Sequence, residues 1–169
     1  MVNQENKTAE RVAKFAVLTS LALVLSFVET LIPINLGIPG AKIGLANLVT
    51  MFTLYVMGPV PAICVSILRI VLSGLLFGNV FSIFYSLSGF ILSFLAMLFL
   101  KKTGAFGIVP VSAVGGVMHN LGQLILAAAL AGEAVFAYFP YLFLCGTVAG
   151  IIIGIIGGII VQRLNGVVE

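Results

Sequence analysis

The feature that most constrains this chain is a series of long apolar segments that are almost free of charge. Of 169 residues, 62% are hydrophobic and 8% are charged, whereas a soluble domain carries about 25% charged residues. A helix that crosses a membrane needs about 20 apolar residues, and six runs meet or approach that length. The predicted helices cover residues about 12–33, 43–57, 61–77, 80–100, 108–131 and 136–162. The linkers are short, so the sequence predicts one all-α membrane domain over residues 1–169, a single bundle of six transmembrane helices in a lipid bilayer.

The basic residues predict how this bundle lies in the membrane. With a cytosolic N-terminus, six of them fall on the inner side, Lys42 falls in an outer loop and Arg69 lies within a span. The six inner residues are Lys7, Arg11, Lys14, Lys101, Lys102 and Arg163. This positive-inside bias predicts that both termini are cytoplasmic. Because the basic residues are scattered at segment ends, the net charge of +3 does not indicate a nucleic-acid partner.

Three polar residues lie within the fifth apolar run. His119, the only histidine of the chain, is four residues before Gln123, and Asn120 is three residues before it. On a helix this spacing forms one polar stripe. A polar stripe inside a membrane is costly unless it faces protein or a cavity, so it indicates a functional site.

Further polar residues fall near the outer ends of the other predicted helices. They are Glu29, Lys42, Asn47, Asn79 and Tyr85, with Arg69 about halfway along the third helix. Together with the stripe on the fifth helix, they predict a substrate-binding pocket that opens to the outside and is closed on the cytoplasmic side. The loop at 34–42 contains Gly and Pro, which favour a shaped turn, and we expect it to cover the pocket.

Structural roles remain open for several of these residues. Glu29 could form an ion pair with Lys42 or Arg69 that holds the bundle together. Asn47, Asn79 and Tyr85 could cap or pack helices instead of binding a solute.

The composition argues against catalysis. The chain has no Asp and only five Glu, so Mg²⁺-dependent chemistry on diphosphates lacks the carboxylates that it needs. His119 has no second His and no nearby Cys for metal ligation. We therefore expect no enzymatic activity, no cofactor and no metal site.

The charges of the predicted pocket indicate a class of ligand. Lys42 and Arg69 outweigh Glu29, which suits an anionic or partly anionic solute. Tyr85 could stack on a ring of such a solute.

Small residues recur every three or four positions along the first helix. They are Ala9, Ala13, Ala16 and Ser20. Such a stripe lets another helix approach closely, either a partner helix or a neighbour within the bundle, and spacing alone does not decide between them. In the last helix Gly150, Gly154 and Gly158 have the same four-residue spacing, and there we expect packing within the bundle.

Three segments, taken together, resemble one known family. They are residues 40–47 (GAKIGLAN), Arg69 followed by residues 75–78 (LLFG), and residues 115–123 (GGVMHNLGQ). This combination is similar to the Gx transporter family, also labelled heptaprenyl diphosphate synthase component I, over nearly the whole chain. The plan of six helices with small residues on the first also resembles the substrate-binding S components of energy-coupling factor (ECF) transporters.

The resemblance implies a function. S components capture vitamins outside the cell and dock through their first helix onto a transmembrane coupling subunit that is driven by ATPase subunits. By resemblance, Ala9, Ala13, Ala16 and Ser20 would dock the coupling subunit, and the outer polar cluster would bind a vitamin-like solute, with flavins the favoured class. We expect a multi-pass protein of a bacterial plasma membrane.

Two alternatives stay open. The synthase label points to a non-catalytic accessory subunit of polyprenyl diphosphate or quinone precursor synthesis. A prenyl synthase itself is disfavoured, because it would carry Asp-rich motifs and this chain has no Asp. The other alternative is an ion-coupled carrier that works alone, with Glu29 or His119 as its proton site.

Overall fold

The protein folds into a bundle of helices with a cavity between its two halves. The computed structural model describes residues 2–31 and 44–168, and the side chains of residues 8–31 and 44–163. Its elements are α1 (Val2–Leu31), α2 (Leu45–Val56), α3 (Pro59–Phe77), α4 (Val80–Thr103), α5 (Ile108–Ala131), the 3-10 helix η1 (Glu133–Tyr138) and α6 (Phe139–Val168). Five of these helices are long and apolar enough to cross a membrane. The predicted all-α, multi-pass membrane protein is therefore confirmed.

Several predicted helices differ from the observed ones in their bounds, most clearly the first helix and the sixth, which was predicted at 136–162 and is observed at Phe139–Val168. The helix predicted to begin near residue 12 begins at Val2, because its polar first turns lie beyond the apolar run and are helical all the same. There Glu10 and Lys14 form an exposed ion pair at four-residue spacing, with 2.6 Å between Oε1 and Nζ. In contrast, α2 has 12 residues and spans only about 18 Å, less than the roughly 30 Å of a hydrocarbon core.

Local signals set the ends of the central helices. Gly58 has φ 94°, a value that favours glycine, and Pro59 follows at the first position of α3, where a missing N–H costs nothing. The start of α4 is a capping box, in which Asn79 Oδ1 accepts from Ser82 N and Ser82 Oγ accepts from Asn79 N. Because these signals end one helix and begin the next, the chain reverses direction between α2 and α3, and again between α3 and α4, within a few residues.

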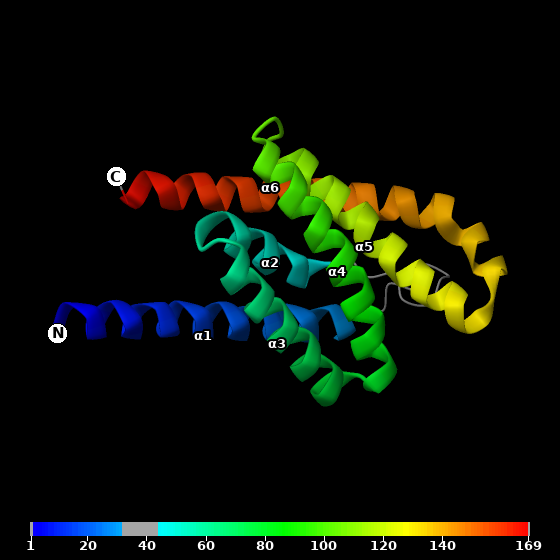
Figure 1. Cartoon of the computed structure of the whole chain (residues 1–169), viewed down its shortest axis with the longest axis horizontal. Coiled ribbons are helices and arrows are strands. Elements are labelled where there is room, and N and C mark those ends of the chain that lie inside the picture. The colour runs from blue at the N-terminus through cyan, green and yellow to red at the C-terminus, as the bar shows by residue number, and fades with distance from the viewer. Residues whose placement is uncertain (1, 32–43, 169) are drawn as a thin grey trace.

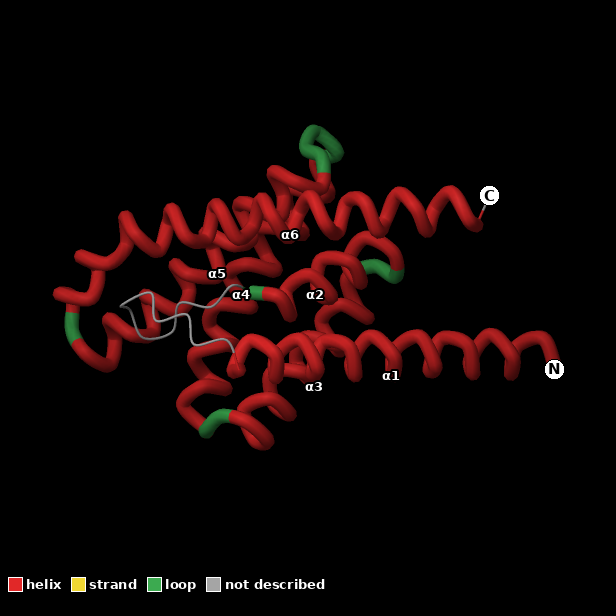
Figure 2. The backbone as a smooth tube through the Cα atoms, turned by 180° about the vertical axis from the view of Figure 1, so that it is seen from behind, coloured by secondary structure: helices red, strands yellow, loops and turns green. Residues whose placement is uncertain are grey.

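The helices pack as two halves of three. In the N-terminal half α1, α2 and α3 contact one another, and in the C-terminal half α5 packs against α4 and α6. The halves meet where α2 contacts α6 and α3 contacts α4. Figures 1 and 2 show both termini at the same end of the molecule, which agrees with an even number of passes.

Glycines bring α5 and α6 unusually close together. A Cβ on Gly116 would lie 2.2 Å from the carbonyl oxygen of Gly146, and one on Gly150 would lie 2.5 Å from that of Ser112. Gly154 also abuts α5, so the prediction of packing within the bundle is confirmed for Gly150 and Gly154. Gly158 is also buried, but no atom lies within 4 Å of its Cβ position, so it makes no such close helix contact. Such close helix approach is typical of small residues in membranes.

Candidate binding site

A cavity of about 120 Å³ lies between the two halves of the bundle. Residues from all six α-helices line it. They come from the last turns of α1, the first turns of α2, the second half of α3, residues 82–97 of α4 and the middles of α5 and α6. The segments from α1, α2 and α3 lie toward the end of the bundle opposite the termini, which is the outer end by the predicted topology (Figure 1).

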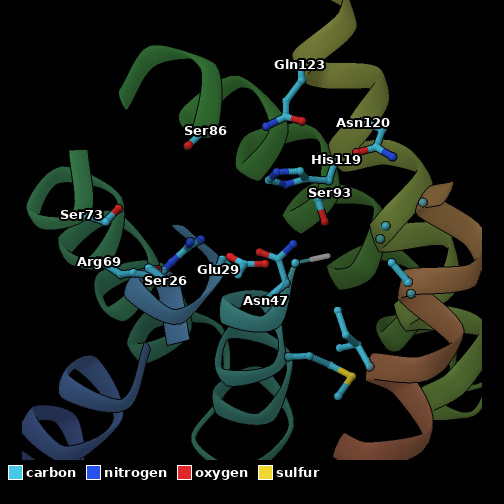
Figure 3. Close-up of a pocket in the computed structure, with 18 of the residues that line it drawn as sticks. Ser26, Glu29, Asn47, Arg69, Ser73, Ser86, Ser93, His119, Asn120 and Gln123 are labelled. Atoms are coloured by element: carbon cyan, nitrogen blue, oxygen red, sulfur yellow. The ribbon is translucent and has the colours of Figure 1, made fainter. Parts of the chain in front are cut away.

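The structure brings together six of the residues predicted from the sequence. Glu29, Asn47, Arg69, His119, Asn120 and Gln123 all line the cavity (Figure 3). In Figure 3 Glu29, Asn47 and Arg69 lie on one side, and the α5 stripe with Ser93 lies on the other. The cavity therefore joins the charged residues of the N-terminal half to the amides and imidazole of the C-terminal half.

Arg69 is the most buried charge of the cavity. The residue is 8% exposed, and no hydrogen-bond partner meets its Nε atom. Glu29 is the carboxylate that interacts with it electrostatically, as one of the structural readings of the sequence expected. A buried N–H without a partner costs about 1–3 kcal/mol. Arg69 is thus a donor held at the cavity wall with part of its hydrogen-bonding capacity unused.

Glu29 also has a structural role that the sequence did not reveal. Its Oε1 accepts the backbone N–H of Leu45, at 2.6 Å, at the first residue of α2. A carboxylate at this position suits the positive end of the helix dipole. At the other end of α2, Lys101 Nζ donates to the carbonyl oxygen of Leu54, where a positive charge is favourable. The short helix is therefore held at both ends by charges of the suitable sign.

The polar stripe of α5 packs against α4 and α6. Gln123 is buried, and a Cβ on Gly89 of α4 would lie 2.9 Å from both Gln123 Cγ and His119 Nε2. Glycine at position 89 is thus what lets α4 approach the stripe. Asn120 donates from Nδ2 to the carbonyl oxygen of Leu142 in α6, at 2.7 Å. This hydrogen bond therefore links α5 to α6. The Oδ1 atom of Asn120 points away from α6 in Figure 3.

Serine residues form a large part of the lining and were missed by the sequence reasoning. They are Ser26, Ser73, Ser82, Ser86, Ser93 and Ser112. Ser26 and Ser73 donate to carbonyl oxygens of their own helices, at 2.9 and 3.2 Å, which leaves their oxygen lone pairs as acceptors. Serine is common in membrane helices, so only its position toward the cavity separates these residues from packing serines.

The other three predicted site residues do not reach the cavity or lie outside the described residues. Asn79 caps α4, and Tyr85 stacks on Phe81 with 5.9 Å between ring centroids; neither lines the cavity. For these two the capping and packing alternatives describe the observed roles. Lys42 and the loop at 34–42, which was expected to cover the pocket, lie outside the described residues.

The lining has little charge and little aromatic surface. Among its described residues, Glu29 and Arg69 are the formal charges beside His119, and Phe77 is the one phenyl ring. Phe77 already packs on Phe27, with 4.9 Å between centroids. Within the described part of the chain, no three His, Cys, Asp or Glu side chains gather as a metal site would require. The cavity is thus suited to hydrogen bonding more than to ring stacking.

Comparison with models of protein families identifies the family of this chain. The model of one family, described as heptaprenyl diphosphate synthase component I, matches residues 18–160. The chain belongs to this family. Comparisons with curated proteins and with solved structures give no match.

In this member of the heptaprenyl diphosphate synthase component I family, the matched region contains every residue that lines the cavity. The first of these is Ser26 and the last is Ile153. The first turns of α1 and the last turns of α6 lie outside the match. The family region and the cavity-forming part of the bundle therefore coincide.

A substitution at Asn79 tests its structural role. Because the Asn79 side chain accepts from Ser82 N at 2.8 Å, Asn79→Ala removes an N-cap. We expect a loss of about 1 kcal/mol in the free energy of unfolding, measured by circular dichroism during denaturation in detergent. Solute affinity should stay within twofold of the wild-type value. A tenfold loss of affinity would instead indicate that Asn79 belongs to the binding site.

Proposed function

We propose that this protein is the solute-binding subunit, or S component, of an ECF-type transporter in the plasma membrane of a bacterium. The observation that carries this proposal is the polar cavity enclosed by all six α-helices, with the buried Arg69 at its wall. Buried ionisable groups in membrane helices are costly and are typical of substrate pathways. The chain acts without catalysis, because the only carboxylate among the described lining residues is Glu29, which already binds the start of α2.

The exposed face of α1 supports docking to a coupling subunit. Ala9, Ala13, Ala16 and Ser20 are all exposed. On the opposite side of the helix, Ala22 packs in the core with Val49 and Val65. The first four small residues are therefore not used in packing within the described bundle, and they form a surface that another helix can approach closely.

A large side chain on this face should prevent docking. We expect Ala13→Trp to abolish capture of the coupling subunit and its ATPases from membranes that contain them, because the small surface is lost. The matched control is Leu21→Trp, at an exposed position roughly 100° around the helix from Ser20. Both variants should bind solute normally. Equal capture by Ala13→Trp and the control would contradict docking through this face.

The family description favours a second candidate. A family described as heptaprenyl diphosphate synthase component I suggests an accessory subunit for polyprenyl diphosphate or quinone precursor synthesis. Such a subunit should co-purify with a soluble synthase and need no ATPase. Recovery of ATPases without a synthase in the same capture experiment would exclude it. A self-sufficient carrier that uses Glu29 or His119 for protons would instead move solute in liposomes without any ATPase.

The flavin class favoured by the resemblance finds limited support in the cavity. A cavity of about 120 Å³ is below the range of about 300–1,000 Å³ that is typical for sites of drug-sized ligands. A flavin carries three fused rings, and Tyr85, which was expected to stack on a ring, does not line the site. Flavin binding would require the two halves of the bundle to move apart.

A further inference from the structure

We propose that the solute of this cavity is a small monocarboxylate whose remaining groups are neutral hydrogen-bonding groups. This inference rests on the proposed solute-binding function and specifies its substrate class. It stands on the guanidinium group of Arg69 in the cavity wall, on the charge balance of the lining and on the size of the cavity.

The position of the carboxylate follows from Arg69. Its Nε has no hydrogen-bond partner although the residue is 92% buried, since 8% of its surface is exposed. A guanidinium group presents its donors in a planar fork that matches two carboxylate oxygens. A carboxylate that enters the cavity therefore gains a charge-assisted hydrogen bond from the guanidinium group of Arg69, which lines the cavity.

The charge balance limits the ligand to one negative charge. Glu29 lies close enough to Arg69 to interact with it electrostatically, and its Oε1 is held by Leu45 N–H. Besides His119, these two residues are the ionisable groups of the described lining. A diphosphate, with two or more negative charges, would face one guanidinium and one opposing carboxylate without a bound cation. A single carboxylate meets the same two groups, and its repulsion by Glu29 is smaller.

The other polar residues of the lining indicate the rest of the molecule. Gln123 and Asn47 each offer an amide, and Ser26 and Ser73 offer hydroxyl oxygens whose protons are already donated to helix carbonyls. Such a lining receives hydroxyl, amide or amine groups of a ligand. A cavity of about 120 Å³ is slightly smaller than the engineered cavity of about 150 Å³ that holds one benzene molecule. The neutral part is thus no larger than a single ring or a short chain.

The test compares acids with their neutral amides on the purified full-length protein in nanodiscs, by isothermal titration calorimetry. The probes are lactate, 3-hydroxybutyrate, pyroglutamate and nicotinate, each paired with its amide, together with inorganic diphosphate and riboflavin. We expect at least one acid to bind at least tenfold more tightly than its amide, and this preference to disappear in Arg69→Gln.

Each other outcome counts against the inference. Acids and amides that bind equally, or no binding by any acid, would overturn it. Binding of riboflavin or diphosphate without any acid would overturn the substrate class and leave the S-component proposal standing. Capture of the coupling subunit by α1 is measured separately, so failure of the substrate class and failure of the proposed function give different results.

Discussion

Arg69→Gln should weaken binding of a carboxylate solute about 10- to 100-fold while leaving the fold intact. The affinity falls because a hydrogen bond to a charged group contributes roughly 1.5–3 kcal/mol, and about 1.4 kcal/mol corresponds to a factor of ten. The fold should persist because Glu29, the carboxylate that loses its partner, is partly exposed and still accepts from Leu45 N–H. The full cost of breaking an ion pair applies when the remaining charge is buried. We expect the free energy of unfolding without solute to change by less than about 1 kcal/mol, as measured by circular dichroism in detergent.

Glu29→Gln is the matched control for this prediction, because it should have the opposite pattern. It removes the negative charge at the first turn of α2, where Leu45 N–H is bound, and a charge at a helix N-terminus contributes about 0.3–1 kcal/mol. Stability should fall by that amount. Affinity for a carboxylate should not fall, since an opposing charge has been removed from the cavity. Equal loss of binding in both variants would mean that the Glu29–Arg69 pair acts only as a structural unit.

Gly116→Ala should cause one of the largest losses of stability available to a single methyl group in this chain. The added Cβ would lie 2.2 Å from the carbonyl oxygen of Gly146, so the backbones of α5 and α6 must separate. Overpacking of this kind typically costs 1–3 kcal/mol. Because α5 and α6 both line the cavity, solute binding should fall together with stability. The measurement is the unfolding midpoint followed by circular dichroism.

The same substitution at Gly158 is the control. No atom lies within 4 Å of its Cβ position, although Gly158 is on α6, the helix that Gly116 contacts, and belongs to the four-residue repeat of Gly150 and Gly154. Alanine is a better helix former than glycine by about 1 kcal/mol, so Gly158→Ala should stabilise the protein slightly. If both substitutions had equal effects, the close contact between α5 and α6 would be disproved.

The sequence predicted the helical bundle well because membrane helices are determined by a local property, the length of apolar runs. The α5 helix was predicted with the bounds that are observed, Ile108–Ala131, since Gly107 and Gly132 interrupt the run at each end. The extra turns of α1 were missed because they are polar and lie outside the apolar run. The sequence predicted that the second helix, at about 43–57, is short, and the observed α2 has 12 residues.

The cavity was predictable in part for a related reason. A charged or strongly polar residue inside an apolar run stands out, as Arg69, His119 and Gln123 do. Ser93 does not stand out, because its orientation toward the cavity depends on how α4 rotates against α5 at Gly89. Asn79 was predicted to be a site residue because of its polarity alone. Its observed role depends on Ser82, three residues later, with which it forms the capping box.

The central question about this protein is whether the cavity beside Arg69 holds a solute. The most direct measurement is equilibrium dialysis of the protein in nanodiscs against a complex growth medium, followed by denaturation and mass spectrometry of the released small molecules. Wild-type protein and Asn79→Ala should both enrich the same small carboxylate, and Arg69→Gln should not. No enriched solute in any of the three proteins, or the same enriched solutes in all three, would contradict the account.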